Sequence, residues 1–528
     1  MSKAIYKFNS GQGALLCSKC SVIIRTGIDF SEDDWKEMRG ELDMPPQTCK
    51  QCSKVNFRKE ILENPQIAKL AEFMETEWEG RAFVVGGWVR DLILGIPSDD
   101  IDIVVEGSGI AFAKKFAKFI GLKGDSVVVF QRFGTAKLKS NEWDLDFVGA
   151  RKESYDPTSR NPAVEVGTIM DDLTRRDLTI NAMAISLHTG EFGEFGKLEN
   201  TFCGMQDLNK RVIQTPIDPD ETFKDDPLRM LRAVRFAARF GFRIEFETQE
   251  AIRKNAKRLD IISAERINVE LEKTLKSKDP KWGFEMLDKV GLLDEVLPEL
   301  VALKGREKNN GVSHKDNFVH TLQVLQNVRD ITDEITLLWT AVLHDIGKAR
   351  VKKFENNSWT FHNHELVSER MINRVAERFK WSTEQTAKVK KITRVHGSPK
   401  ELVKDGVSDS AIRRFVLETE DVFGALILFC TCDITTSFED KKKRQQDAIN
   451  SLAQRAADIR ERDNLANWKN PVSGHWLMET LGCKPGKLIG ETLAAVKEAI
   501  LEGDCENTTE SAQEFALEWV RKNKSTRV

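Results

Sequence analysis

The sequence predicts an α+β protein in which a mixed α/β region precedes an almost wholly helical one. Three observations lead to this fold class. Strand and turn signals alternate with helical ones through residues 61–215, apolar residues recur with a 3.6-residue period from Pro216 to the end, and two Cys-x-x-Cys pairs lie within residues 1–60. Because 528 residues exceed what one hydrophobic core usually serves, we expect several domains.

The nearly equal numbers of basic and acidic side chains exclude a strong electrostatic field of one sign over the whole protein. The chain has 80 basic and 83 acidic side chains, a net charge of −3, so a nucleic-acid partner would have to bind to local basic patches. No run of about 18 apolar residues occurs, and the first residues lack the apolar segment of a secretory signal. We therefore expect a soluble, cytoplasmic protein that has no membrane partner.

Residues 1–60 carry four of the nine cysteines, Cys17, Cys20, Cys49 and Cys52. Two Cys-x-x-Cys knuckles can place four thiolates around one ion, so the pattern predicts a small zinc-ribbon-like module that folds on binding Zn²⁺. Redox-active cysteines or a disulfide are the alternative. A reducing compartment favours the metal.

Residues 61–215 contain the first candidate site. FVVGGWVRDLILG reads as strand, turn and helix, and Gly86 and Gly87 would let backbone N–H groups approach a polyphosphate. DDIDIVVEG reads as a strand on which Asp100 and Asp102 share a face, so that both carboxylates could hold Mg²⁺ ions for an in-line displacement at phosphorus. The alternative is a tight turn followed by a solvated strand edge.

Further strands are expected in VVVFQRFGTAKLK and in WDLDFVGA, and RRDLTINAMA follows at 175–184. In this last motif a cation, Arg176, lies beside a hydrogen-bond acceptor, Asp177, and an amide, Asn181. A triphosphate and a ribose hydroxyl need groups of this kind. A surface Arg–Asp pair that caps a helix is the alternative.

Residues 216–308 are expected to form a helical neck. Asp225-Asp226-Pro227 is typical of a helix start. Arginines then recur at steps of 3, 3, 4 and 4, which predicts one helical stripe suited to phosphate-rich ligands, with a solvated helix face as the alternative: Arg229, Arg232, Arg235, Arg239 and Arg243.

A polar, turn-rich stretch at 305–312 predicts a domain boundary, followed by a helical domain over 309–460 and a helical tail over 461–528. Imidazoles and carboxylates recur in or beside apolar helical segments of this domain: His320, His344, Asp345, His364, His396 and Asp433. Such ligands from several helices suit a transition metal or a di-metal centre. The remaining histidines are expected to be hydrogen-bonded residues on helix surfaces: His188, His314, His362 and His475.

Four motifs in order carry a family resemblance. GGWVRDLILG with DDIDI, RRDLTINAMA, DDPLRMLRAVRFAARF at 225–240 and ERINVE at 265–270 resemble the successive motifs of class II tRNA nucleotidyltransferases and their poly(A) polymerase relatives. The resemblance implies a polymerase-β-like nucleotidyltransferase head in which Asp100 and Asp102 hold Mg²⁺. It makes Asp146 the third carboxylate, with Asp144 on the same strand face as the alternative.

The resemblance also implies roles in nucleotide binding. Asp226 and Arg229 would read the base of CTP or ATP in place of a template, and other residues would bind the sugar and phosphates: Gly86, Gly87, Arg90, Arg176, Asp177, Asn181 and Arg232. The implied activity is addition of C, C and A to the 3′ end of tRNA, and the loop between Ala150 and Arg175 resembles the one kept by enzymes that complete CCA. A poly(A) polymerase, an A-adding enzyme, and an RNA-repair or RNA-binding protein with a vestigial transferase are the alternatives.

His344-Asp345-Ile346-Gly347-Lys348 resembles the signature of HD domains. The resemblance implies a metal-dependent phosphohydrolase that acts on 2′,3′-cyclic phosphates or phosphomonoesters at RNA ends. A decayed HD domain kept for structure is the competing interpretation. The tail resembles the segment that closes HD-containing members of the family, and we expect it to help hold the acceptor arm of tRNA.

Overall fold

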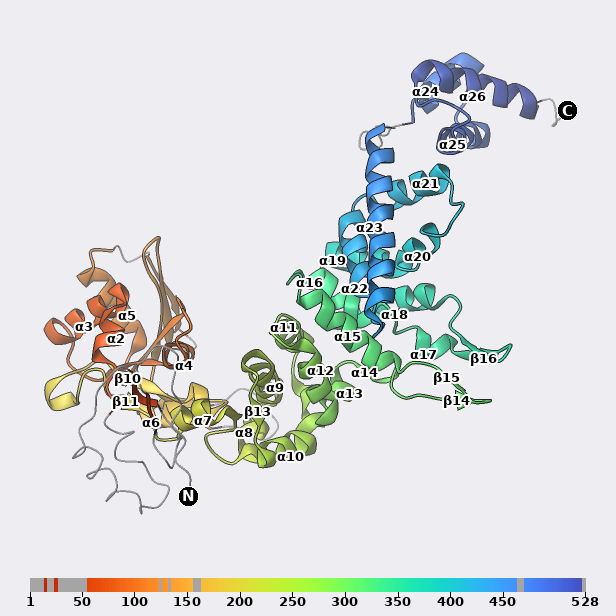
Figure 1. Ribbon diagram of the computed structural model, residues 1–528. Helices are drawn as coiled ribbons and strands as arrows, with labels where there is room; N and C mark the ends of the chain where they lie inside the picture. Colours follow the sequence, from red (N-terminus) through yellow and green to blue (C-terminus); the bar gives the residue numbers. More distant parts are fainter. Residues whose placement is uncertain are drawn as a thin grey trace. The chain divides into compact units, whose positions relative to one another are not determined.

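The computed structural model describes residues 14–16, 23–26, 55–122, 126–131, 134–154, 163–462 and 470–524. It divides into two compact units, Met1–Leu297 and Pro298–Val528 (Figure 1). Near the start, β1 (Ala14–Leu16) pairs antiparallel with β2 (Ile23–Thr26). The four cysteines of the predicted zinc module lie outside the described residues.

A seven-stranded mixed sheet forms the head of the first unit, with the order β11-β10-β3-β4-β7-β6-β5. Its central strand β4 (Ile101–Val105) pairs antiparallel with β3 (Ala82–Val85) and parallel with β7 (Asp144–Gly149). The other strands are β5 (Val127–Phe130), β6 (Thr135–Lys139), β10 (Ala184–Ser186) and β11 (Leu198–Glu199). The predicted strands and the mixed α/β head are confirmed.

Aromatic packing covers one face of the sheet. Phe112 of α5 (Gly109–Phe119) contacts Phe147 of β7, with ring centroids 5.5 Å apart, and Phe73 of α3 (Pro65–Thr76) packs on Phe112. Leu145 and Phe147 are fully buried on this side. Because side chains alternate along a strand, Asp146 points to the opposite face.

Smaller elements surround the sheet. Helix α4 (Gly87–Leu94) follows β3 directly, and β8 (Arg151–Ser154) pairs with β9 (Ala163–Val166) on either side of residues 155–162, which lie outside the described part of the chain. Helices α2 (Arg58–Leu62), α6 (Ile169–Thr174) and α7 (Gly204–Lys210) complete the head.

The neck is helical, as predicted. It contains α8 (Pro219–Asp225), α9 (Leu228–Phe240), α10 (Phe246–Asn255), α11 (Ala264–Leu275), α12 (Pro280–Lys289) and α13 (Leu292–Val296). One short parallel pair interrupts the pattern, β12 (Val212–Ile213) with β13 (Arg243–Ile244). Helix α9 ends at Phe240 because Gly241 adopts a left-handed conformation with φ 67°. Arg243 therefore lies on a strand, and its predicted place on the arginine helix is wrong.

The second unit is built from helices, as predicted, with two added hairpins. Its helices run from α14 (Pro298–Val301) through α15 (Asn317–Arg329), α16 (Ile335–Leu343), α17 (Lys348–Val351), α18 (His364–Phe379), α19 (Thr383–Val395), α20 (Ser398–Leu402), α21 (Asp409–Thr419) and α22 (Phe423–Cys432) to α23 (Glu439–Arg462). The hairpins are β14 (Lys308–Asn309) with β15 (Val312–Ser313), and β16 (Lys353–Glu355) with β17 (Ser358–Thr360).

The segment predicted as a linker, 305–312, contains most of the first hairpin, and the chain divides earlier, after Leu297. Two contacts explain this difference. Arg378 of α18 pairs with Glu299 of α14 at 2.8 Å, and the Trp359 indole N–H donates to the Val312 carbonyl at 3.1 Å. The first contact ties Glu299, which precedes the predicted boundary, to the second unit. The second ties Val312, which lies within the predicted linker, to the same unit.

Three helices close the chain, α24 (Gly474–Leu481), α25 (Lys487–Glu502) and α26 (Thr509–Lys524). They share a small core around Leu477, Val496, Ala512 and Ala516. Their expected contact with tRNA stays a prediction. None of the helices in the described ranges combines the length and apolar character needed to cross a bilayer.

Candidate active sites

Three carboxylates meet on the face of the head sheet opposite the aromatic packing of α3 and α5. Asp102 of β4 lies opposite Asp146 of β7 in the parallel register, and Asp100 lies just before β4. One oxygen from each carboxylate lies within 4.8 Å of the others. Asp144 is not part of this group, so the structure brings together the three aspartates that were predicted as a set.

The electrostatics of this group fit a divalent cation. The pKa of Asp102 is raised to about 6, and burial is the main cause. Arg176 acts to lower it, whereas the neighbouring Asp100 and Asp146 add to the increase. Hard cations such as Mg²⁺ prefer carboxylate oxygens, and an ion would relieve the repulsion among three anions. The residues present therefore fit the Mg²⁺ that the sequence predicts.

Lys137 of β6 extends this row of charges and was missed by the sequence analysis. It lies opposite Asp146 in the antiparallel register, with its ammonium 2.8 Å from Asp146 and 2.7 Å from Asp144. The ammonium donates to both carboxylates, and these hydrogen bonds, the one to Asp144 more than the one to Asp146, raise the pKa of Lys137. The alternation of TAKLK places Lys137 and Lys139 on one face, but the sequence does not show which strand lies beside them.

Gly86 allows a guanidinium to lie against the turn between β3 and α4. A Cβ atom at Gly86 would lie 2.5 Å from Nη1 of Arg176, and the residue has φ 71°. Arg176 donates to the Asn181 carbonyl at 3.3 Å and to the carboxylate of Asp172 at 2.9 Å. Asp172, which is fully buried, was also missed. Burial alone would raise its pKa, but Arg176 and Arg175 outweigh that effect and lower it.

Asp177 and Asn181 belong to a buried network. Asp177 accepts from the Asn181 amide at 2.9 Å, and Arg90 donates to the Asn181 side-chain oxygen at 2.5 Å. Arg90 also forms two hydrogen bonds with Asp91 and is only 4% exposed. Arg90 thus orients the motif through Asn181, and direct contact between Arg90 and a nucleotide stays a prediction.

The arginines of α9 have partners inside the protein. Arg232 donates to Asp177 at 2.6 Å, and Arg235 donates to Glu270 of α11 at 2.6 Å. Burial raises the pKa of Asp177, but Arg232 outweighs this effect and lowers it. The expectation of an open phosphate-binding stripe is therefore wrong for the buried Arg235, because the stripe packs against carboxylates from other elements.

The predicted base-reading pair lies where α8 meets α9. Asp226 accepts from the Leu228 N–H at 3.1 Å and pairs with Arg266 of the ERINVE motif at 2.8 Å. Arg229 donates to the carbonyls of Thr222 and Arg175, at 3.2 and 2.6 Å. Three of the sequence motifs thus meet at this point. Recognition of a base by Asp226 and Arg229 stays a prediction.

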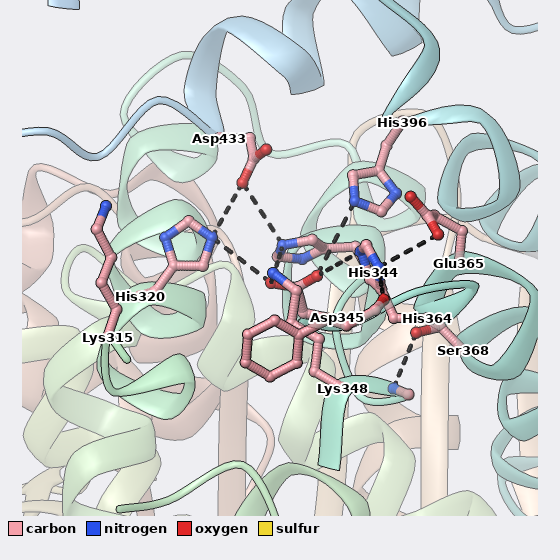
Figure 2. A network of polar contacts seen from close by, with 12 residues as sticks. Lys315, His320, His344, Asp345, Lys348, His364, Glu365, Ser368, His396 and Asp433 are labelled. Atoms are coloured by element: carbon pink, nitrogen blue, oxygen red, sulfur yellow. Dashed lines mark hydrogen bonds and ion pairs between the residues drawn. The ribbon is translucent and has the colours of Figure 1, made fainter. Parts of the chain in front are cut away.

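The second site lies where the ends of several helices converge in the second unit (Figure 2). His320 projects from α15, His344 and Asp345 follow α16, and His364 begins α18. His396 follows α19 and Asp433 follows α22. All six predicted ligands are brought together. The other histidines lie outside the cluster, although His188 and His314 are buried rather than on a helix surface.

Hydrogen bonds orient every imidazole in the same sense. The Nδ1 atoms of His344, His364 and His396 contact the carbonyls of Ala341, Phe361 and Thr393 at 3.0, 3.0 and 2.7 Å. Nδ1 of His320 contacts the Thr435 hydroxyl at 2.8 Å. A carbonyl can only accept, so Nδ1 of the first three rings carries a proton and Nε2 is the nitrogen that can bind a metal.

Asp345 joins two groups of ligand atoms. Asp345 with His320 and His344 forms one group, Asp345 with His364 and His396 forms the other, and the ligand atoms within each group lie within 4.8 Å of one another. Four buried atoms in this centre have no hydrogen-bond partner: Nε2 of His344 and of His364, and Oδ1 of Asp345 and of Asp433. Buried polar atoms normally have partners, so this centre fits metal ions with Asp345 shared between the two groups.

Two lysines beside the ligands were missed. Lys348, the last residue of the HDIGK motif, pairs with Asp345 at 2.6 Å, and Lys400 pairs with Asp433 at 2.5 Å. Both carboxylates are almost fully buried. Burial alone would raise the pKa values of Asp345 and Asp433, but the surrounding cations and hydrogen bonds hold both well below the usual range.

Metal binding at this centre is expected to strengthen with pH. Burial lowers the pKa of His344, but Asp345 and Asp433 outweigh burial and raise it to about 9. A metal must therefore displace a proton at neutral pH, so the affinity of metal-free protein for Mn²⁺ should rise about tenfold per pH unit between pH 6.5 and 8.5. Calorimetric titration in buffers of different ionisation enthalpy measures this proton release.

The same titration of His344→Ala/Asp345→Ala protein isolates the contribution of this centre from that of the carboxylates in the head. An affinity for Mn²⁺ that does not change over this pH range would contradict the assignment of a proton to His344.

Three family models match the chain in succession. They are the poly A polymerase head domain over residues 82–214, the probable RNA and SrmB-binding site of polymerase A over 241–303, and the HD domain over 317–425. The matched ranges contain the three carboxylates of the head and five of the six ligands of the second site, Asp433 lying beyond the HD match.

Curated relatives agree with this order of domains. The multifunctional CCA protein of Haemophilus influenzae is 32% identical over 410 residues, which cover 72% of this chain and 91% of the relative. The A-adding tRNA nucleotidyltransferase of Deinococcus radiodurans is 28% identical over 84% of this chain and 96% of the relative. The chain spans only 39% of nucleotidyltransferase lcsQ of Purpureocillium lilacinum, to which it is 40% identical over 245 residues.

Solved structures share the fold. The apo form I of a CCA-adding enzyme has a TM-score of 0.58 and 24% identity, covering 89% of this chain and 97% of that structure. The Thermotoga maritima CCA-adding enzyme, solved in complex with tRNA, has a TM-score of 0.56 and 24% identity, covering 88% and 99%.

The fold and the carboxylate site define a nucleotidyltransferase in which an HD domain follows the helical neck along the chain. Given the similarity to the Haemophilus influenzae protein along most of both chains, this chain belongs to the family of tRNA nucleotidyltransferases.

Proposed function

We propose that this enzyme adds C, C and A to the 3′ end of tRNA from CTP and ATP without a template. The observation that carries the proposal is the cluster of Asp100, Asp102 and Asp146 on one face of the head sheet, with the Arg176 guanidinium beside it. The similarity to the multifunctional CCA protein supports tRNA as the substrate.

The reaction joins the 3′-hydroxyl oxygen of tRNA to the α-phosphorus of the nucleotide, and the bond to the leaving pyrophosphate breaks. Bound Mg²⁺ would supply charge stabilisation at the transferring phosphoryl group. Asp100, Asp102 and Asp146 would hold it. Arg176 would contact the phosphates, and Asp172 would keep its guanidinium in place.

An A-adding enzyme is the second candidate, because the Deinococcus radiodurans relative of that name is matched over 96% of its length. The two candidates differ in the products expected from different tRNA ends. We would incubate tRNA lacking CCA and tRNA ending in CC with all four nucleoside triphosphates, and then sequence the 3′ ends. Complete CCA on both substrates supports our proposal, whereas A added only to the CC end supports the alternative.

Base choice should depend on the junction between α8 and α9. Arg229→Ala removes a guanidinium that could donate to the acceptors of C or A, so addition of U or G should become detectable while the carboxylate site stays intact. Sequencing of products made from all four nucleotides measures the change. Arg243→Ala, an exposed arginine beyond the end of α9, is the control and should keep wild-type choice. Products that remain purely C and A would contradict a base-reading role for Arg229.

We further propose that the HD domain hydrolyses phosphoesters at RNA ends, either 2′,3′-cyclic phosphates or phosphomonoesters. In either case water adds at phosphorus and one P–O ester bond breaks. The six clustered ligands and their four unpartnered buried atoms support a working centre over a decayed one. Lys348 and Lys400 would keep Asp345 and Asp433 ionised for metal binding.

For the first 60 residues we propose a structural zinc site at Cys17, Cys20, Cys49 and Cys52. Elemental analysis of protein purified without chelator should find about one Zn²⁺ per chain that is lost on Cys17→Ser or Cys49→Ser, with CMP addition retained on a minimal acceptor stem. Protein without zinc would contradict this site. Thiolate ligation also agrees with a cytoplasmic location, where thiols stay reduced.

A further inference from the structure

A large cavity opens above the ligands of the HD domain. Its volume is about 1390 Å³, and its lining includes His320, Asp345, His364, His396 and Asp433. Pockets for drug-sized ligands commonly hold about 300–1,000 Å³. The cavity is therefore much larger than a phosphate group requires, so the residues farther from the ligands have room to contact more of a substrate.

The wall of this cavity carries more cations than carboxylates. Lys348 and Lys400 are paired with the ligands Asp345 and Asp433. Four further cations line it, Lys315, Arg394, Lys441 and Arg444, together with two further carboxylates, Glu365 and Glu401. Arg444 donates to the backbone carbonyl of Asp440, which leaves its charge uncompensated. Among the described residues, Lys315 and Lys441 have no carboxylate partner, and Figure 2 shows Lys315 beside His320.

An exposed aromatic ring lies on the same wall. Phe438 is 73% exposed and lines the cavity, and it directly precedes α23, on which Lys441 and Arg444 lie. Its backbone carbonyl accepts from the Lys442 N–H at 2.9 Å, which fixes it to the first turn of α23. A ring that packs so little is free to stack on a ligand.

Phe438 also lies near the metal centre in the sequence. Phe438 lies five positions after Asp433, so their Cα atoms are at most about 18 Å apart even in fully extended chain. The arrangement therefore combines a site for a phosphoester, cations for further phosphates and a platform for one base. A basic groove with exposed aromatic rings is how proteins bind single-stranded nucleic acid.

We propose that this cavity binds the single-stranded end of an RNA over several nucleotides, with a base stacked on Phe438 and backbone phosphates on Lys441 and Arg444. The inference rests on the proposed hydrolase function and names its substrate class. The centre then acts on RNA ends in preference to small phosphoesters, because a strand of several nucleotides reaches Phe438, Lys441 and Arg444, whereas a small ester reaches only the metal ligands.

Paired substrates test the preference. The full-length enzyme, loaded with Mn²⁺, is assayed on a tetraribonucleotide ending in a 2′,3′-cyclic phosphate and on glycerol 1,2-cyclic phosphate, and in parallel on the 3′-phosphorylated tetraribonucleotide and glycerol 2-phosphate. Phe438→Ala should lower the ratio of kcat/KM between the ribonucleotide and the glycerol ester about tenfold, through KM. A ratio equal to that of the wild type would overturn the role of Phe438.

A matched pair of double variants tests the cations. Lys441→Ala/Arg444→Ala removes two charges from the cavity wall, whereas Lys442→Ala/Lys443→Ala removes two charges from the same helix outside that wall. The logarithm of the affinity for RNA falls linearly with the logarithm of the salt concentration. The first variant should reduce the magnitude of this slope by about 1.4, and the second should leave the slope unchanged. Equal effects from both variants would overturn the phosphate contacts.

Crosslinking separates this inference from the hydrolase proposal. A 3′-phosphorylated tetraribonucleotide carrying 4-thiouridine is irradiated with the full-length protein, and the crosslinked peptides are mapped. Crosslinks within residues 434–449 support RNA in the cavity, whether or not the wild type hydrolyses an ester. A wild type that hydrolyses no ester would contradict only the hydrolase proposal. Crosslinks confined to residues outside this segment would overturn the inference.

Discussion

Asp102→Asn is expected to abolish nucleotide addition while leaving the binding of tRNA nearly unchanged. The substitution removes a partly buried carboxylate of the cluster formed with Asp100 and Asp146, and Asn is a weaker metal ligand. Charge stabilisation at the transferring phosphoryl group is the main catalytic contribution in such reactions, so the rate of CMP incorporation should fall by about 10³-fold or more. Single-turnover incorporation into tRNA measures this rate, and a filter-binding titration measures the affinity for tRNA.

Asp144→Asn is the matched control, since it makes the same chemical change two residues from Asp146 on β7. Asp144 is outside the cluster and pairs with Lys137. It should retain most of the activity, whereas near-normal incorporation by Asp102→Asn would mean that the site has been misassigned.

The pH dependence offers a second check on Asp102. Because the pKa of Asp102 in the metal-free protein is raised to about 6, protons compete with Mg²⁺ below that pH. The Mg²⁺ concentration required for half-maximal addition should therefore increase as the pH falls from 7 to 5. A requirement that does not change over this range would contradict metal binding through Asp102.

The second large effect is expected in the HD domain. His344→Ala together with Asp345→Ala removes two ligands, one of which belongs to both groups of the centre. Metal-dependent hydrolysis of a cyclic phosphate or phosphomonoester should fall to the background rate. Addition of C, C and A should persist, because all of the transferase carboxylates lie in the first unit.

Both substituted residues are fully buried, so folding has to be tested separately. Circular dichroism would monitor the double variant, and His320→Ala, which replaces a ligand with a 14% exposed side chain, provides a milder change with the same expected loss. The converse variant, Asp102→Asn, should keep hydrolysis. If the wild type hydrolyses no phosphoester with any divalent metal, the centre is structural.

The sequence by itself determined the features that depend on local pattern. The alternation around Asp100 and Asp102 predicted a strand that places its carboxylates on one side, and the strand β4 with its neighbours β3 and β7 agrees. The six ligands of the HD domain were predicted because each lies in or beside an apolar helical segment, and ligands from several helices suit a metal centre. The helical nature of the neck followed from its 3.6-residue period.

Only the tertiary structure decided which charged groups face one another. The sequence could not choose between Asp144 and Asp146, since the choice depends on the register of β7 against β4. It missed Lys137 because a cross-strand partner on β6 is not local, and it assigned Arg235 to phosphate because Glu270, its partner, lies 35 residues away. Periodicity shows the face on which a side chain lies, whereas pairing between distant segments decides whether that face meets solvent, a metal or an opposite charge.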